Sequence, residues 1–143
     1  MSKGNTLEND ILKLLFNGTT IADLAENDTT SPLTNLYVSL HTADPGEAGT
    51  QLTNEVTYTS YARVAVARSG AGWTVTNNSV SPAANISFPA GTGGSGTVTH
   101  FGIGTVTTGG AGILLYSGTV SPNIVCGNGI TPILTTASTI TED

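Results

Sequence analysis

The chain has 143 residues, the size of one ordinary domain, and a formal net charge of −6 from 10 acidic and 4 basic residues. Only 10% of the residues are charged, against about 25% in a typical domain, so Thr, Ser, Asn and Gly must cover much of the surface. Four basic residues cannot form the positive patch that nucleic acid or an anionic membrane requires, which excludes both as partners.

The segment 1–30 is predicted to be helical, with its signal in residues 5–27. One apolar stripe at helical spacing is formed by Leu7, Ile11, Leu14 and Leu15. Asn17-Gly18 should end this helix, because glycine adopts positive φ without strain, and a second short turn should carry Ile21, Leu24 and Ala25. The segment lacks the continuous apolar run of a signal peptide, and no stretch approaches the 18 apolar residues of a membrane span.

From residue 31 onward the apolar residues recur with a period of two, which predicts strands. The expected strands are 35–42, 60–68, 72–76, 83–88, 97–105, 112–120 and 130–140. The expected core is Leu36, Val38, Leu40, Val64, Val66, Trp73, Ile86, Phe88, Phe101, Ile103, Leu115 and Ile133. Short strands separated by Gly, Pro and Asn turns favour an all-β fold, a single jelly-roll-like β-sandwich over residues 31–143. We therefore expect one domain, 1–143, with a short N-terminal helical region.

No motif predicts a cofactor, a catalytic group or a metal ion. Residues 91–96 match G-x-G-x-x-G by letter, but a strand-like Thr97-Val98-Thr99 follows in place of a helix, so a loop or hairpin is expected. A metal site that joins the two histidines, His41 and His100, to a carboxylate is formally possible. The simpler interpretation is a strand histidine bonded to a neighbour. The single cysteine, Cys126, is expected to be a small buried hydrophobe.

Two short stretches are candidate contact elements. Asp44-Pro45-Gly46-Glu47 reads as a β-turn, in which Asp44 accepts a bond from the backbone two residues on and Gly46 takes positive φ. This turn is a candidate contact loop, and a weak cation site at Asp44, Glu47 and Glu55 remains an alternative. Tyr58 and Tyr61 form a candidate aromatic contact patch.

Three passages carry a resemblance to a known family. They are "LYVSLHTADPGEAGTQLTNEVTYTSYARVAVARS" (36–69), "GWTVTNNSVSPAANISFPAGTGGSGTVTHFGIGT" (72–105) and "ILLYSGTVSP" (113–122). The sequence resembles a family of small tailed-bacteriophage virion proteins that often carry the label "phage tail fiber protein". The resemblance implies a structural protein of the virion, made in the bacterial host cytoplasm, that works by binding and is not an enzyme.

Two positions on the virion are compatible with this resemblance, the head and the tail. A fibre shaft usually shows repeats or coiled-coil heptads, and this sequence has neither. A compact, weakly charged sandwich therefore favours a capsid decoration (cement) protein, bound to the major capsid protein as a homo-oligomer, dimer or trimer. The alternative is a tail-fibre or receptor-binding tail protein that contacts the host surface, with a surface glycan as a possible ligand.

Overall fold

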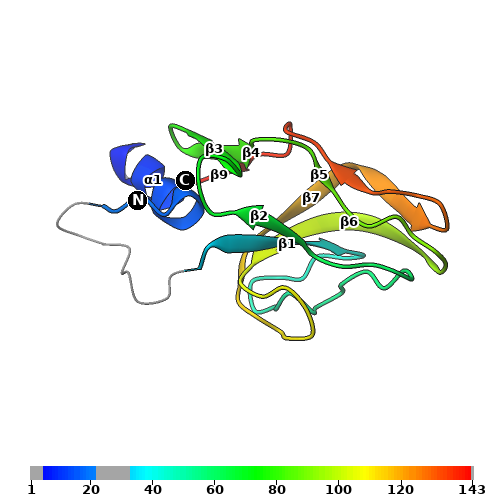
Figure 1. Ribbon diagram of the computed structural model, residues 1–143. Coiled ribbons are helices and arrows are strands. Elements are labelled where there is room, and N and C mark those ends of the chain that lie inside the picture. Colours follow the sequence, from blue (N-terminus) through cyan, green and yellow to red (C-terminus); the bar gives the residue numbers. More distant parts are fainter. Residues whose placement is uncertain (1–4, 22–32, 143) are drawn as a thin grey trace. The chain divides into compact units, whose positions relative to one another are not determined.

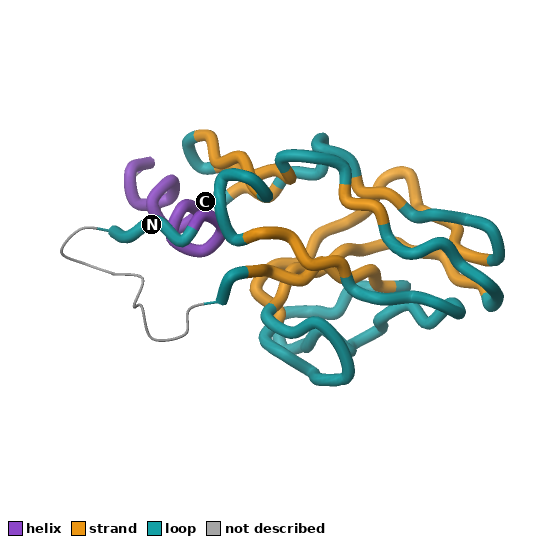
Figure 2. Tube along the Cα trace, in the orientation of Figure 1, coloured by secondary structure: helices purple, strands orange, loops and turns teal. Residues whose placement is uncertain are grey.

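The computed structural model describes residues 5–21 and 33–142 (Figures 1 and 2). It begins with helix α1 (Asn5–Leu12), which continues as a π-helical turn, η1 (Lys13–Asn17). The strands are, in chain order, β1 (Asn35–His41), β2 (Val64–Ala67), β3 (Trp73–Thr76), β4 (Ser79–Pro82), β5 (Ile86–Ser87), β6 (Ser95–Gly104), β7 (Leu114–Gly127), β8 (Ile133–Leu134) and β9 (Ile140–Thr141). They form sheets in the orders β2-β1-β6-β7, β3-β4-β9 and β5-β8. The all-β class is confirmed, and the jelly-roll-like sandwich stays a prediction.

The chain divides into two compact units. The first unit comprises Met1–Asn35, Val66–Asn85 and Leu134–Asp143, and the second comprises Leu36–Ala65 and Ile86–Ile133. Within the second unit, β6 pairs antiparallel with both β1 and β7. Within the first, β4 pairs antiparallel with both β3 and β9. The prediction of one domain over 1–143 stays a prediction.

The helix of the first unit ends where the sequence indicates but buries another face. Gly18, with φ 65°, closes the π-helical turn by donating its N–H to the carbonyl of Lys13. The predicted stripe is wrong, because Leu7 is 39% exposed, whereas Leu12 and Phe16 are fully buried. The Phe16 ring packs edge-to-face on Trp73 at 4.8 Å between centroids. This aromatic contact holds Phe16, rather than the predicted leucine stripe, in the interior of the first unit. The second turn predicted at Ile21–Ala25 lies largely outside the described residues.

Several strand boundaries differ from the predicted ones. The sequence missed β4, and the long strand predicted at 130–140 is two short strands, β8 and β9. In β8, Leu134 is buried and Ile133 is 42% exposed, so the core prediction for Ile133 is wrong. A two-residue strand is too short for alternation to reveal its inner face. The predicted core residues that are only half-buried are Val64, Val66 and Leu115.

The β1–β6 pair of the second unit has one apolar face and one polar face. Val38 lies opposite Ile103 and Leu40 opposite Phe101, while Ser39 lies opposite Gly102 on the other face. A Cβ on Gly102 would come within 2.7 Å of the Nε2 atom of His41. Glycine at this position therefore leaves room for buried polar side chains on the sheet.

Candidate contact surface

The turn at residues 44–47 shows two of its predicted features. The backbone N–H of Gly46 donates to Oδ1 of Asp44 at 2.9 Å, and Gly46 adopts a φ of 70°. The Asn54 amide donates to the Asp44 carbonyl at 3.0 Å, which holds the turn to the following loop. Asp44, Gly46 and Glu47 are exposed, whereas Pro45 is buried. The predicted bond to Asp44 and the positive φ of Gly46 are confirmed, whereas the backbone turn closed by a hydrogen bond is Gly46–Gly49, in which the Gly49 N–H donates to the Gly46 carbonyl at 3.0 Å. Three of the four residues 44–47 are exposed and present a surface for contact.

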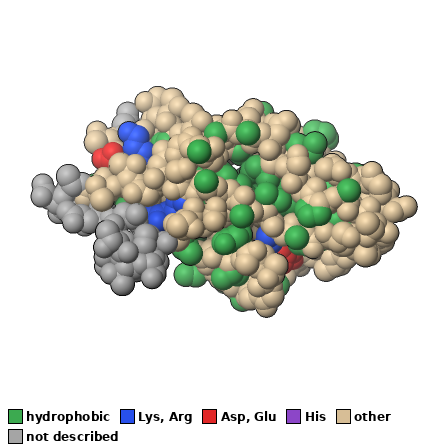
Figure 3. Space-filling model, in the orientation of Figure 1, with side chains coloured by type: hydrophobic (Ala, Val, Ile, Leu, Met, Phe, Trp, Pro, Cys, Tyr) green, Lys and Arg blue, Asp and Glu red, His purple; other side chains and the backbone are tan. Residues whose placement is uncertain are grey.

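A hollow of about 370 Å³ lies between this turn and the first half of β7. Its lining residues are Asp44, Gly46, Glu47, Leu114, Leu115, Tyr116 and Ser117. Figure 3 shows that acidic and basic side chains occupy little of the visible face of the molecule. The hollow itself combines the carboxylates of Asp44 and Glu47 with a strand that has no Asp, Glu, Lys or Arg.

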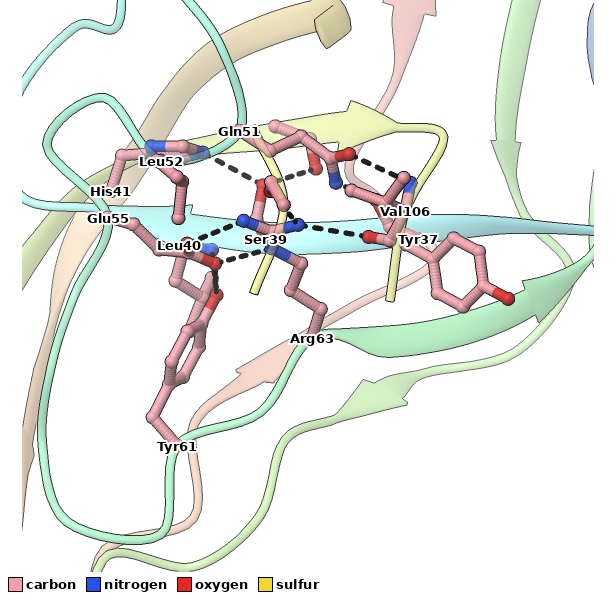
Figure 4. A network of polar contacts seen from close by, with 12 residues as sticks. Tyr37, Ser39, Leu40, His41, Gln51, Leu52, Glu55, Tyr61, Arg63 and Val106 are labelled. Atoms are coloured by element: carbon pink, nitrogen blue, oxygen red, sulfur yellow. Dashed lines mark hydrogen bonds and ion pairs between the residues drawn. The ribbon is translucent and has the colours of Figure 1, made fainter. Parts of the chain in front are cut away.

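A buried ion pair fixes the long loops of the second unit (Figure 4). Glu55 accepts two bonds from the Arg63 guanidinium, at 2.7 Å from Nε and 2.8 Å from Nη2. The two side chains are 11% and 3% exposed, respectively. Nη1 of Arg63 donates to the carbonyls of Val106 (3.0 Å) and Gly110 (3.2 Å). Arg63 thereby joins the loop between β1 and β2 to the loop between β6 and β7. The hydrogen bonds to Glu55 raise the pKa of Arg63 further above its ordinary value.

Tyr61 connects this ion pair to the sheet. Its hydroxyl donates to Oε1 of Glu55 at 2.8 Å and accepts the Leu40 N–H at 3.0 Å. Burial is the largest cause of the raised pKa of Tyr61, so the phenol stays protonated. Tyr61 therefore fixes Glu55 relative to β1, and Glu55 in turn fixes the Arg63 guanidinium.

Gln51 is a second buried anchor, which the sequence analysis missed. It is 0% exposed, its Oε1 accepts the Val106 N–H at 3.0 Å, and its backbone N–H donates to the Ala111 carbonyl at 2.9 Å. A Cβ on Gly104 would clash with the Gln51 side chain. The alternation of Phe101-Gly102-Ile103-Gly104 is a sequence signal for such a socket, because glycine on one face of a strand marks close approach by another group.

His41 is a buried structural residue. Its Nδ1 lies 2.8 Å from the Thr53 carbonyl, and its Nε2 lies 2.8 Å from the Ser39 hydroxyl. Burial lowers the pKa of His41, so the ring is neutral, with Nδ1–H donating to the carbonyl and Ser39 donating to Nε2. Ser39 and His41 are both 0% exposed, so this serine–histidine pair offers no access to a substrate. The interpretation of His41 as a strand histidine bonded to its neighbours is confirmed.

The residues proposed for cation binding do not come together. Glu55 is engaged by Arg63 and Tyr61, whereas Asp44 and Glu47 are exposed. Nδ1 of His100 lies 2.9 Å from the Thr99 hydroxyl. Across residues 5–21 and 33–142, no group of three or more His, Cys, Asp or Glu side chains is arranged to hold a metal ion.

The candidate aromatic patch needs correction, because Tyr58 is only 2% exposed. Its hydroxyl donates to the Pro89 carbonyl at 2.8 Å, and its ring packs edge-to-face on Tyr61 at 5.4 Å. Burial raises the pKa of Tyr58 to about 12. Tyr61 in turn stacks on Phe88 at 6.4 Å. These rings fill the interior of the second unit because their area gains more from burial than from a surface position.

The glycine-rich loop and the cysteine have the simple roles predicted for them. Thr59 donates its N–H to the Gly93 carbonyl at 2.9 Å, and β6 follows directly from Ser95. Cys126 is 1% exposed, and burial raises the pKa of its thiol. Neither element adds a reactive group to the contact surface.

Comparison with known families places the chain among bacteriophage fibre proteins, a class of virion structural proteins. The matching family model is described as podophage GP4 fiber I protein gp80, it covers residues 2–141, and the chain belongs to this family. No curated protein matches the chain. The protein is thus a component of the virion, as the resemblance implied. None of the helices in the described ranges has the length and apolar character of a membrane span.

Proposed function

We propose that the protein is a tail-fibre component of a podophage particle that works by binding and not by catalysis. The observation that carries the proposal is the fibre family model, which matches nearly the whole chain. Absence of repeats and heptads argues against a long shaft, but it does not argue against a compact domain of a fibre. The family match therefore favours the tail-fibre alternative over capsid decoration, which stays unconfirmed.

The arrangement of polar groups supports binding as the mode of action. Three described side chains of a type used in catalysis, Ser39, His41 and Glu55, are bonded inside the second unit. The exposed elements are loops on a strand scaffold, the usual location of contact residues. Homo-oligomer formation, as a dimer or trimer, and contact with a host surface glycan are further parts of this proposal.

Antibody labelling of intact particles tests the position on the virion. Purified antibody against the chain, seen by electron microscopy, should mark the tail region, and quantitative mass spectrometry should give a few to a few tens of copies per particle. Label over the whole head with hundreds of copies would instead establish capsid decoration.

Competition for adsorption tests contact with the host. Free protein added to host cells before the phage should reduce adsorption if the chain contacts the receptor itself. Unchanged adsorption at saturating protein would confine its function to contacts within the particle.

A further inference from the structure

A polar hollow of about 720 Å³ lies in the first unit, where helix α1 approaches the turn between β3 and β4 (Figure 1). The residues that line this α1 hollow are Thr6, Asn9, Asp10, Lys13, Asn77 and Asn78. Its volume falls within the range of about 300–1,000 Å³ that sites for small ligands usually have. The α1 hollow is therefore large enough to receive a small molecule or one unit of a polymer.

One face of the helix supplies most of this lining. Thr6 lies three and four positions before Asn9 and Asp10, and Lys13 lies three positions after Asp10. Residues at these spacings share one face of a helix. The side-chain amide of Asn9 donates to the Asn77 carbonyl at 2.6 Å, which holds this face against the turn.

The turn is fixed on its other side by the C-terminal segment. The side-chain amide of Asn78 donates to the Glu142 carbonyl at 3.2 Å, and the Glu142 N–H donates to the Asn78 carbonyl at 2.8 Å. Asn77 adopts a φ of 54°, a conformation that asparagine tolerates better than most residues. Both walls of the α1 hollow are thus held in place by the fold itself, which lowers the entropic cost of binding a ligand.

The chemistry of the lining defines the ligand class. The six residues offer a hydroxyl, three amides, a carboxylate and an ammonium group, and so both donors and acceptors. Asp10 and Lys13 form no ion pair within residues 5–21 and 33–142, so their polar atoms can bond to a ligand. Their opposite charges favour neither an anion nor a cation. A neutral molecule with several hydroxyls matches this lining, because each hydroxyl both donates and accepts.

We propose that the α1 hollow binds a neutral sugar unit of a polysaccharide on the host surface. Asp10 accepts hydrogen bonds from sugar hydroxyls, and the Lys13 ammonium and the Asn77 amide donate to sugar oxygens. One such site is weak because its polar groups are also solvated, and a polymer that contacts several copies of the chain gains avidity. This inference gives a site to the glycan contact and so rests on the proposed function.

Titration with single sugars tests the ligand class. D-Glucose, D-galactose, L-rhamnose and N-acetyl-D-glucosamine would each be added to the full chain, with amide NMR shifts as the measurement. We expect at least one sugar to bind saturably, with a dissociation constant on the order of 1 mM, and to shift the amides of residues 6–13 and 77–78. Sodium acetate and methylammonium chloride, which carry one charge and no hydroxyl, are the controls and should not bind.

Matched asparagine variants locate the site. Asn77→Gly removes an amide from the α1 hollow, and Asn54→Gly makes the same change in the second unit, where φ is 57°. Glycine suits both backbone conformations, and urea denaturation would verify that both variants are folded. We expect Asn77→Gly to weaken sugar binding about two- to tenfold, the usual size for one hydrogen bond, and Asn54→Gly to leave it unchanged.

The carboxylate should matter more than the amide. Asp10→Asn keeps the shape of the side chain but replaces a charged acceptor with a neutral amide. Because hydrogen bonds to charged groups are stronger, we expect this variant to weaken sugar binding about tenfold. Glu47→Gln, an exposed carboxylate of the second unit, is the control and should bind sugar as the wild type does.

Several results would overturn the proposal. Binding of no sugar in the panel, NMR shifts away from the α1 hollow, or equal losses in Asn77→Gly and Asn54→Gly would each remove this site. Binding of acetate or methylammonium as tight as that of the sugars would make the hollow an ion site. Antibody labelling of the tail depends on none of these results. A chain that blocks adsorption but binds no sugar would contact the host elsewhere, so the two failures are distinguishable.

Discussion

At the scale of single residues, Arg63 and Glu55 hold most of the charge that the second unit buries. Arg63 is the only Lys or Arg in residues 36–65, and it donates to Glu55 and to two carbonyls of the opposite loop. Desolvating both charges is costly, and the bidentate geometry offsets that cost only while both partners are present.

Removal of one partner of this ion pair should therefore be severe. We expect Glu55→Ala to lower the free energy of unfolding by about 3 kcal/mol, because it leaves the Arg63 guanidinium buried and unpaired. Urea denaturation followed by circular dichroism measures the change. Glu47→Gln is the control, since its exposed carboxylate should change stability by less than about 0.5 kcal/mol. A similar small effect for both variants would contradict the structural role of the ion pair.

His41 should make stability depend on pH. Burial lowers the pKa of His41 in the folded state, so below about pH 6.5 the unfolded chain binds a proton that the folded chain does not. The free energy of unfolding should then decrease from pH 7.5 to pH 5.5, by about 1 kcal/mol from this group. Urea denaturation at both pH values would measure the decrease. His41→Gln should show a smaller pH dependence than the wild type, and an identical dependence would exclude His41 as its source.

At the scale of elements, β6 contacts the core on one face and the polar loops on the other, because its two faces carry different side chains. Phe101 and Ile103 face the apolar side, and Gly102 and Gly104 leave the other side open to His41 and Gln51. The loops that carry these polar side chains can thus lie directly on the sheet. Packing at native density makes such a close contact intolerant of added atoms.

A methyl group on β6 should disturb that contact. We expect Gly104→Ala to cost about 1–3 kcal/mol of stability, because its Cβ would overlap the Gln51 side chain and displace the bond to Val106. The matched control is Gly70→Ala, since a Cβ there meets nothing within 4 Å and its φ is not in the left-handed region. Thermal unfolding of the two variants, scanned side by side, would distinguish them. Equal melting temperatures would show that the loop moves aside without cost.

At the scale of the whole molecule, the chain passes between its two units several times. The boundaries fall at residues 35/36, 65/66, 85/86 and 133/134, so neither unit is one continuous segment. Ordering one unit therefore brings together chain segments that belong to the other unit. This lowers the entropic cost of closing the loops of that other unit. This connectivity supports the prediction of one cooperative domain.

The optical probes of this chain can test that cooperativity. The single tryptophan, Trp73, lies in the first unit, and the four tyrosines, Tyr37, Tyr58, Tyr61 and Tyr116, lie in the second. We expect tryptophan fluorescence and tyrosine near-ultraviolet circular dichroism to give coincident urea transitions, as one two-state domain requires. Two separate midpoints would divide the chain into independent domains.

Local features were predictable from the sequence. Gly18 ends the helix, Asp44 and Gly46 form their turn, and alternating apolar residues mark β1 and β6. Each depends on backbone preferences or on neighbours within a few positions. The resemblance to phage proteins rested on the same letters, and the family match confirms it.

The tertiary structure decided which side chains meet. Gln51 bonds to Val106, 55 positions away, and Tyr58 to Pro89, 31 positions away, and no local pattern encodes either pair. The turn at 44–47 and the first half of β7 are likewise separated by most of the second unit, yet they line one hollow. The amino-acid sequence determined β1, β6, the Asp44–Gly46 bond and the family. The contact surface arose only on folding, because loop closure and core packing select among many pairings that local propensities leave equal.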